Sequence, residues 1–245
     1  GFSPALYNDL AQPHEPSPWL NHVYVTGTVT GHDCVGGLLG RLYEGNISNS
    51  YTTVEVIGYE TAGLGTPDFP DSLGGLCGRA DFSTISIAYS TGTVTGYESL
   101  GGLCGFIELS TISDAYTTGK VSGTISVGGF VGRLRGGEIS GVYSAGLAEG
   151  NDKVGGFIGD LTDGTVSQSF WDTQTSGQSV GVGLGSSTGI TGKTTSDMKK
   201  KTTFTDAGWD FNTVWDIETQ AEDGAVSYPF LQGGLQTPAP GHQLP

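Results

Sequence analysis

Apolar and polar residues alternate over short stretches that glycines separate, and this arrangement repeats along the chain. Stretches such as TGTVTG and SVGGFVG are rich in β-branched residues and too short for a helix. None shows the spacing of about 3.6 residues that is typical of an amphipathic helix. The pattern therefore predicts short β-strands rather than helices.

The pattern recurs in units of 27 residues. Four copies have this length, and they begin at Tyr24, Tyr89, Tyr116 and Tyr143. A further copy begins at Tyr51 and is longer, because residues 59–73 contain an insertion. Three columns recur across the copies: a valine column that starts at Val29, a glycine pair that starts at Gly36-Gly37, and an isoleucine column that starts at Ile47.

A unit of this size cannot bury its own apolar face, whereas stacked copies place like residues above like residues. The sequence therefore predicts an all-β fold, a β-solenoid of stacked coils with about three short strands each. Neighbouring coils would pair at about 4.8 Å. We expect the glycines at fixed offsets to form the corners, where a positive φ angle is needed.

The columns divide the chain into four parts. We expect an N-terminal extension over residues 1–23, a five-coil solenoid over 24–169, a C-terminal cap over 170–236 and an extended tail over 237–245. One short helix is predicted in the cap at Thr195–Lys200, with Thr195 or Ser196 as its N-cap.

Five aromatic residues of the cap form a dense set, which is predicted to seal the open end of the core. They are Trp209, Phe211, Trp215, Tyr228 and Phe230. The alternative for this set is an aromatic platform that binds sugars.

The three cysteines do not form the even, dense set of a disulfide-rich protein. Cys77 and Cys104 share an apolar column, so we expect a buried free pair, with a disulfide between adjacent coils as the alternative. Cys34 falls in a variable column and is expected near the surface.

The charge limits the classes of partner. The 245 residues carry a formal net charge of −15, and their basic residues are scattered. Nucleic acid binding needs clustered Lys and Arg, so it is not expected. No apolar run approaches the roughly 20 residues of a membrane-spanning helix, so membrane insertion is not expected either.

One column brings charged residues together. Asp81 and Glu108 would lie on successive coils, with Arg135 one coil further. A glycosidase needs two carboxyl groups roughly 5–10 Å apart, and carboxyl groups on successive coils could meet this requirement. The simpler interpretation is a row of solvated charges on the surface. We therefore assign no catalytic residue.

No metal or cofactor site is assigned from the sequence. The four histidines fall in no repeated column, and they are His14, His22, His32 and His242. Weak calcium binding remains a hypothesis for Asp160 with Asp163, or for Asp68 with Asp71 in the insertion.

The columns resemble a known family. The motif Tyr-x-x-Gly-x-Val-x-Gly, followed by Val/Leu-Gly-Gly-Phe/Leu-x-Gly and Ile-Ser, is similar to the GLUG-type repeats of bacterial surface proteins and secreted peptidases. The resemblance covers residues 23–169 and extends into a Trp-Asp-rich tail at 170–230 that such arrays often carry. It implies a β-solenoid and an extracellular location, without implying a reaction.

These observations favour a non-enzymatic extracellular module that serves structure or adhesion in a prokaryotic surface or matrix protein. Its partners would be other protein subunits or a host or matrix surface, with glycans as a further option. The first alternative is a subunit of a self-assembling filament, joined through its termini or solenoid ends. The second alternative is a solenoid that binds or cleaves carbohydrate.

Overall fold

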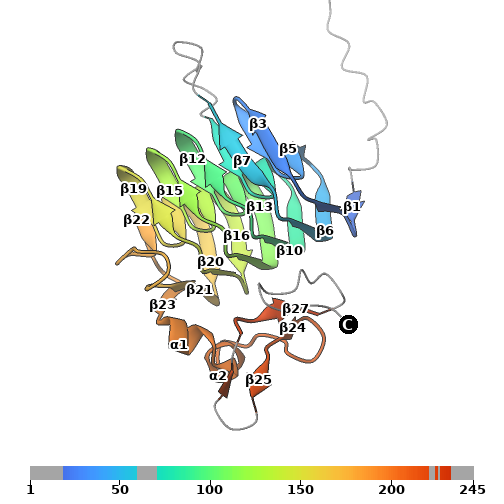
Figure 1. Ribbon diagram of the computed structural model, residues 1–245, viewed down its shortest axis with the longest axis vertical. Coiled ribbons are helices and arrows are strands. Elements are labelled where there is room, and N and C mark those ends of the chain that lie inside the picture. The colour runs from blue at the N-terminus through green and yellow to red at the C-terminus, as the bar shows by residue number, and fades with distance from the viewer. Residues whose placement is uncertain (1–18, 60–70, 221–223, 226, 233–245) are drawn as a thin grey trace, which may run out of the picture.

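The computed structural model describes residues 19–59, 71–220, 224–225 and 227–232. These residues form a β-solenoid of stacked parallel coils, as predicted (Figure 1). The expected tail at 237–245, residues 1–18 of the N-terminal extension and most of the insertion lie outside the described residues.

Two faces of the solenoid are flat sheets with one strand from each coil. The first sheet contains β3 (Thr28–Gly31), β7 (Glu55–Gly58), β11 (Val94–Thr95), β14 (Val121–Ser122) and β18 (Ala148–Glu149). The second contains β4 (Cys34–Gly36), β8 (Ser72–Gly74), β12 (Glu98–Gly101), β15 (Ile125–Gly128) and β19 (Asp152–Gly155).

The third sheet is longer and bends around the remaining side of each coil. One part of it contains β5 (Leu39–Tyr43), β9 (Cys77–Asp81), β13 (Cys104–Thr117), β16 (Val131–Ser140), β20 (Ile158–Ser167) and β22 (Val182–Leu184). The rest consists of β1 (Trp19–Asn21), β2 (Tyr24–Val25), β6 (Asn46–Thr52), β10 (Thr84–Ser90), β17 (Tyr143–Ser144), β21 (Ser169–Asp172) and β23 (Ile190–Lys193).

Like residues lie above like residues, as the columns predicted. The valine column runs in register from Val29 through Val56, Val94 and Val121 to Ala148. The isoleucine column runs from Ile47 through Ile85, Ile112 and Ile139 to Val166. Most of these side chains are fully buried. The isoleucine column lies in one hydrophobic cluster and the valine column in a second, and each cluster runs along the stack.

The stack extends beyond the five copies seen in the sequence. Trp19–Asn21 pairs in register with Asn46–Ser48 and so adds a strand before the first copy. At the other end, β22 pairs with β20 and β23 pairs with β21, which forms a sixth coil without the repeat motif.

The corners differ from the prediction. In the described part of the chain, most corner residues with positive φ are not glycine. Three corner columns contain such residues: His22, Asn49, Ile87, Asp114 and Gln168; Glu44, Phe82 and Leu109; and Ser99, Ser126 and Lys153. Asp33 also has a positive φ, one position before the third column, since Cys34 pairs with Ser72 in that column. The glycine pair recurs because neighbouring coils approach closely at this position, and not because it forms a corner. A Cβ on Gly102 would lie 2.3 Å from the carbonyl oxygen of Gly129 in the next coil, so only glycine allows the coils to approach this closely.

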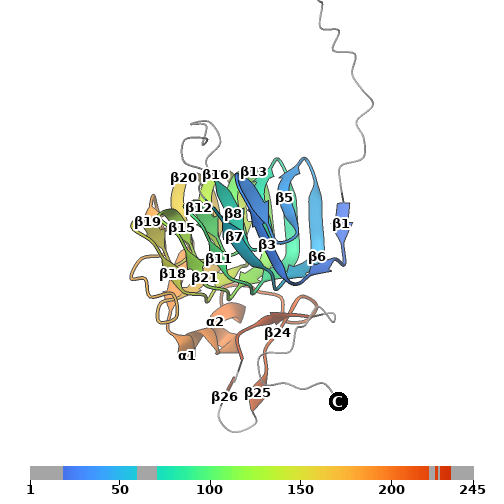
Figure 2. The ribbon, with the colours of Figure 1, turned by 45° about the horizontal axis from the view of Figure 1, so that its top comes forward.

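The chain after the last coil folds back along one side of the solenoid (Figures 1 and 2). The described residues between 195 and 232, here called the C-terminal layer, contain α1 (Thr195–Met198) and α2 (Lys201–Thr205) instead of the single helix expected. Two small antiparallel pairs follow: β24 (Trp215–Asp216) with β27 (Phe230–Leu231), and β25 (Thr219–Gln220) with β26 (Gly224–Ala225).

The N-cap of α1 also differs from the expectation. Thr194 fills this position, one residue before the predicted range, and its hydroxyl accepts a hydrogen bond from the backbone N–H of Asp197 at 3.1 Å. The helix ends at Met198, whose side chain is buried in the C-terminal layer.

Candidate functional site

The charged column lies on the outer face of the long sheet, where Asp81 on β9, Glu108 on β13 and Arg135 on β16 stand in register as predicted. The structure adds two arginines that the sequence analysis missed. Arg41 and Arg79 occupy a column two residues earlier, which places them on the same face of the sheet. We call the five residues the charged ladder.

Every member of the charged ladder is paired with a neighbouring member. Asp81 accepts hydrogen bonds from Nε of Arg41 and from Nε of Arg79, each at 2.8 Å. Nη2 of Arg79 donates to Glu108 at 2.6 Å, and Arg135 also donates to Glu108. The contacts therefore join coils one to four in an unbroken series of ion pairs.

The inner part of the ladder is removed from water. Asp81 is 1% exposed and Arg79 is 6% exposed. The guanidinium of Arg79 also lies over the ring of Phe106, at 4.4 Å from the ring centroid. A buried carboxylate whose two oxygens both accept from arginine has little freedom to act as a nucleophile or proton donor. The inner part of the ladder is therefore a buried network of ion pairs, while Arg41 and Arg135 at its two ends are exposed.

Cys77 and Cys104 are also buried and have a structural role. Cys77 and Cys104 are free, buried and directly in register on adjacent strands. The Cys77 thiol donates to the carbonyl oxygen of Arg79 at 3.1 Å. Contact with Cys77, together with burial, raises the pKa of the Cys104 thiol well above its ordinary value, which keeps it in the unreactive thiol form. Cys34 is half-buried, and burial raises the pKa of its thiol.

A column of stacked tyrosines follows one corner of the solenoid and consists of Tyr24, Tyr51, Tyr89, Tyr116 and Tyr143. Neighbouring rings lie 4.7 to 5.4 Å apart between centroids and are nearly parallel. We call this set the tyrosine column. Its last three members, together with Phe170, form the floor on which the C-terminal layer packs.

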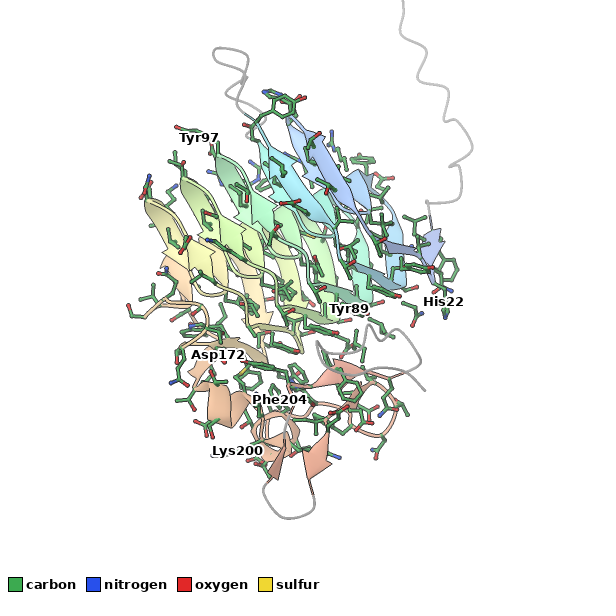
Figure 3. All side chains as sticks on the ribbon, viewed as in Figure 1. His22, Tyr89, Tyr97, Asp172, Lys200 and Phe204 are labelled. Carbon is green, nitrogen blue, oxygen red and sulfur yellow. The ribbon has the colours of Figure 1, made fainter. Side chains whose placement is uncertain are left out.

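The aromatic set of the C-terminal layer covers this column and not the end of the core, so the predicted position was wrong. Trp215 is fully buried, and its indole N–H donates to Asp114 at 3.2 Å. Trp209 is 7% exposed and donates to the carbonyl oxygen of Gln168 at 2.9 Å. Tyr89 lies on the underside of the coils and Phe204 in the layer below (Figure 3). With both indoles buried, the tryptophans offer no open face to a sugar ring.

Hydrogen bonds fasten the layer at further points. The hydroxyl of Tyr143 donates to the carbonyl oxygen of Pro229 at 2.7 Å, and the hydroxyl of Tyr228 donates to Asp172 at 2.6 Å. Burial opposes ionisation of Asp172, but hydrogen bonds from Tyr228, Thr175, Thr195 and Gln174 together hold the pKa of this carboxyl below its ordinary value. Asp172 is therefore a charged anchor for the layer.

The first calcium hypothesis does not fit the structure. Asp160 is buried and paired with Lys153 at 2.8 Å and with Arg133 at 3.6 Å, so its charge is already balanced. Asp163 is exposed and accepts from the backbone N–H of Gly164 at 2.8 Å. In the second hypothesis, Asp68 lies outside the described residues, and Asp71 lies beside different partners from those expected, namely His32 and Asp33.

Comparisons with known proteins agree with the repeat pattern. The family model of the GLUG motif matches residues 31–57. A protein from Evansella cellulosilytica named "Putative Gly-rich membrane protein" is 48% identical over 54 residues, which are 22% of this chain and 6% of that protein. The chain thus spans only a small part of the length of this relative. No solved structure matches the chain.

Within the described ranges, none of the helices has the length and apolar character needed to cross a bilayer. The matched motif covers the end of β3, all of β4 to β6 and most of β7, and the same columns continue in register through the following coils. The chain carries the GLUG motif, and the coils that repeat its columns form a β-solenoid.

Proposed function

We propose that the chain is a non-enzymatic, extracellular structural and adhesion module of a bacterial surface protein. The observation that carries this proposal is the use of the repeated residues. The repeated apolar columns form the core, and the glycine pair allows close contact between coils. The residues of the charged ladder form ion pairs with one another. Such a stack is a stiff support that holds contact surfaces away from a cell.

One exposed aromatic surface supports an adhesive role. Trp19 on β1 is 72% exposed and Tyr24 on β2 is 65% exposed, while the tyrosines that the C-terminal layer covers are mostly buried. Exposed aromatic residues are enriched at sites of protein and glycan contact. We place the adhesive contact at this end of the tyrosine column.

The test is a binding screen of the purified chain, coupled to beads, against bacterial and host cells, matrix proteins and glycans. A double variant Trp19→Ala/Tyr24→Ala should lose at least about 10-fold in retained beads, as expected when two aromatic anchors are removed. The matched control is Tyr97→Ala, because Tyr97 is exposed (38%) and lies far from His22, the neighbour of Trp19 and Tyr24 in the chain (Figure 3). Equal binding by the double variant and the control would contradict this contact surface.

Two further measurements address the other parts of the proposal. Antibodies against the chain should label intact cells of the parent organism, and labelling only after lysis would contradict the extracellular location. No turnover is expected on a polysaccharide panel. Turnover that disappears in Asp81→Ala and Glu108→Ala variants, with their fold retained, would show that the ladder is catalytic.

A filament subunit is the second candidate, and the open strand edges favour it. Among the described residues, β3, β4 and β5 at one end and β22 at the other pair on one side only, whereas Ala148 of β18 is bonded to Ser176 and Gln178 on its outer side. Unpaired strand edges can accept a strand from another molecule. Negative-stain electron microscopy over a concentration series separates the two candidates. Isolated short rods support the module, and regular fibres that vanish when residues 1–18 are deleted support the filament.

A further inference from the structure

Three side chains of types that can bind metal ions meet where the insertion leaves and rejoins the solenoid. His32 and Asp33 lie in the turn between β3 and β4, and Asp71 directly precedes β8. One ligand atom from each residue lies within 4.8 Å of the others, and Nδ1 of His32 lies 2.8 Å from Oδ1 of Asp33. We call these three residues the His32 cluster.

The backbone around the His32 cluster is fixed by bonds between the first two coils. The N–H of Tyr59 donates to the carbonyl oxygen of Gly31 at 3.2 Å, and the N–H of Ser72 donates to that of Asp33 at 2.7 Å. The side chains therefore converge from two anchored segments and not from one mobile loop. The ligand atoms lie within 4.8 Å of one another, and a bound ion would require side-chain rotations that bring them to about 3.3 Å, the spacing of ligands at 2.0 Å in a tetrahedron.

The geometry points to a site for a divalent transition metal, for which we propose Zn²⁺. Imidazole nitrogen and carboxylate oxygen are both ligands that zinc binds in proteins. Calcium instead prefers six to eight oxygen ligands, which a histidine does not supply. The side chain of His32 is 21% exposed and that of Asp33 is 67% exposed, so water can reach the ion and complete its coordination.

The consequence would be a metal clamp at the base of the insertion. Asp33 belongs to the first coil, whereas Asp71 is the residue through which the chain re-enters the second coil. A bound ion would join the two coils at the point where the repeat is interrupted. The formal net charge of −15 also favours accumulation of cations near this surface. This inference does not depend on the proposed adhesive function.

The experiment is isothermal titration of the untagged full chain with ZnCl₂ and, separately, with CaCl₂ in a non-chelating buffer. We expect one Zn²⁺ per chain with submillimolar affinity and weaker binding of Ca²⁺. His32→Ala and Asp71→Asn should each weaken Zn²⁺ binding by at least about 10-fold, because each removes a ligand. Thermal melts of the metal-free variants check that the fold is retained.

Two control variants separate this site from other zinc ligands in the chain. Cys34→Ser removes a half-buried thiol next to Asp33, and His22→Ala removes an exposed histidine at another corner. Both should bind Zn²⁺ like the unmodified chain. The proposal is overturned if the unmodified chain binds no Zn²⁺, if His32→Ala and Asp71→Asn bind it unchanged, or if only Cys34→Ser loses it.

Discussion

The second glycine of each pair controls how closely two coils can stack. At Gly102 the obstacle to a side chain is the backbone carbonyl of Gly129, and the Cβ and hydroxyl oxygen of Thr117 lie close by. Backbone atoms that are paired on both sides cannot move aside for an added methyl group. The glycine column in the sequence is therefore a packing requirement between coils.

Gly102→Ala should lower the free energy of unfolding by about 3 kcal/mol, the upper part of the range for an overpacked core. The matched control is Gly150→Ala, where the closest atoms to the added Cβ are methyl groups of Val127 and Val154 at 2.9 Å, and the nearest backbone atom, the carbonyl oxygen of Gly123, lies at 3.4 Å. These side chains can adjust, so a loss near 1 kcal/mol is expected there. Urea unfolding curves provide the comparison, and equal losses in both variants would show that the carbonyl is not the obstacle.

The corners explain why one residue-scale prediction was wrong. Ile87 and Leu109 adopt φ angles of 49° and 46°, which cost roughly 1–2 kcal/mol each for residues with a side chain. The strands on both sides of each corner are paired with neighbouring coils, and this pairing outweighs the local cost. Local sequence preference therefore did not identify these corners, although Asn49 and Gly141 in the same column do fit it.

At the scale of elements, the C-terminal layer depends on a few aromatic anchors. Trp215 is fully buried between the layer and the tyrosine column, with Tyr116 and Tyr143 each 6.2 Å away between ring centroids. Its indole N–H also reaches Asp114, a carboxyl whose pKa is raised by burial. The side chain thus combines a large buried surface with one polar bond.

Trp215→Ala should destabilise the protein by about 3–5 kcal/mol, as expected for loss of a large buried aromatic side chain. Trp215→Phe keeps most of the apolar contact and loses the bond to Asp114, so a smaller loss is expected. Limited proteolysis should cut the layer of the alanine variant while the coils stay intact. Resistance of the layer to protease in Trp215→Ala would mean that other contacts hold it.

The sequence predicted elements well where the repeat determines them. It placed the stacked columns, the free cysteine pair and the register of Asp81, Glu108 and Arg135 correctly. Arg41 and Arg79 carried a usable signal, because residues two positions apart in a strand share a face. The layer was misplaced since order along the chain does not show that a segment turns back. The His32 cluster was missed although the register carried a signal for it, because Ser72 pairs with Cys34 and Asp71 therefore lies beside Asp33 in the stack.

At the scale of the whole molecule, the buried tyrosines should make the folded state less stable as the pH rises in the alkaline range. Burial raises the pKa of Tyr143 well above its ordinary value, and it also raises that of Tyr116. The unfolded chain would ionise these residues near pH 10. A raised pKa in the folded state means that this contribution to stability is complete below about pH 10 and is lost as the pH rises further.

The urea midpoint should therefore fall steeply once the pH exceeds about 10. Tyrosine absorbance and circular dichroism should show the buried rings ionising together with loss of structure. Tyr143→Phe removes one buried hydroxyl, so its midpoint should depend less on pH in this range, although it also loses the bond to Pro229. Ionisation of all tyrosines with the structure intact would contradict this account.

The position of the C-terminal layer changes how the coils share their stability. In a plain stack each coil contacts only its neighbours, so an unfolding front can start at either end and move coil by coil. Trp215 bonds to Asp114, 101 residues earlier, and Tyr143 bonds to Pro229, 86 residues later. These bonds connect the later coils through the C-terminal layer, so we expect these coils to unfold together as one cooperative unit. Fraying should then begin at the coils around Trp19 and Tyr24, which lie beyond the main contacts of the C-terminal layer.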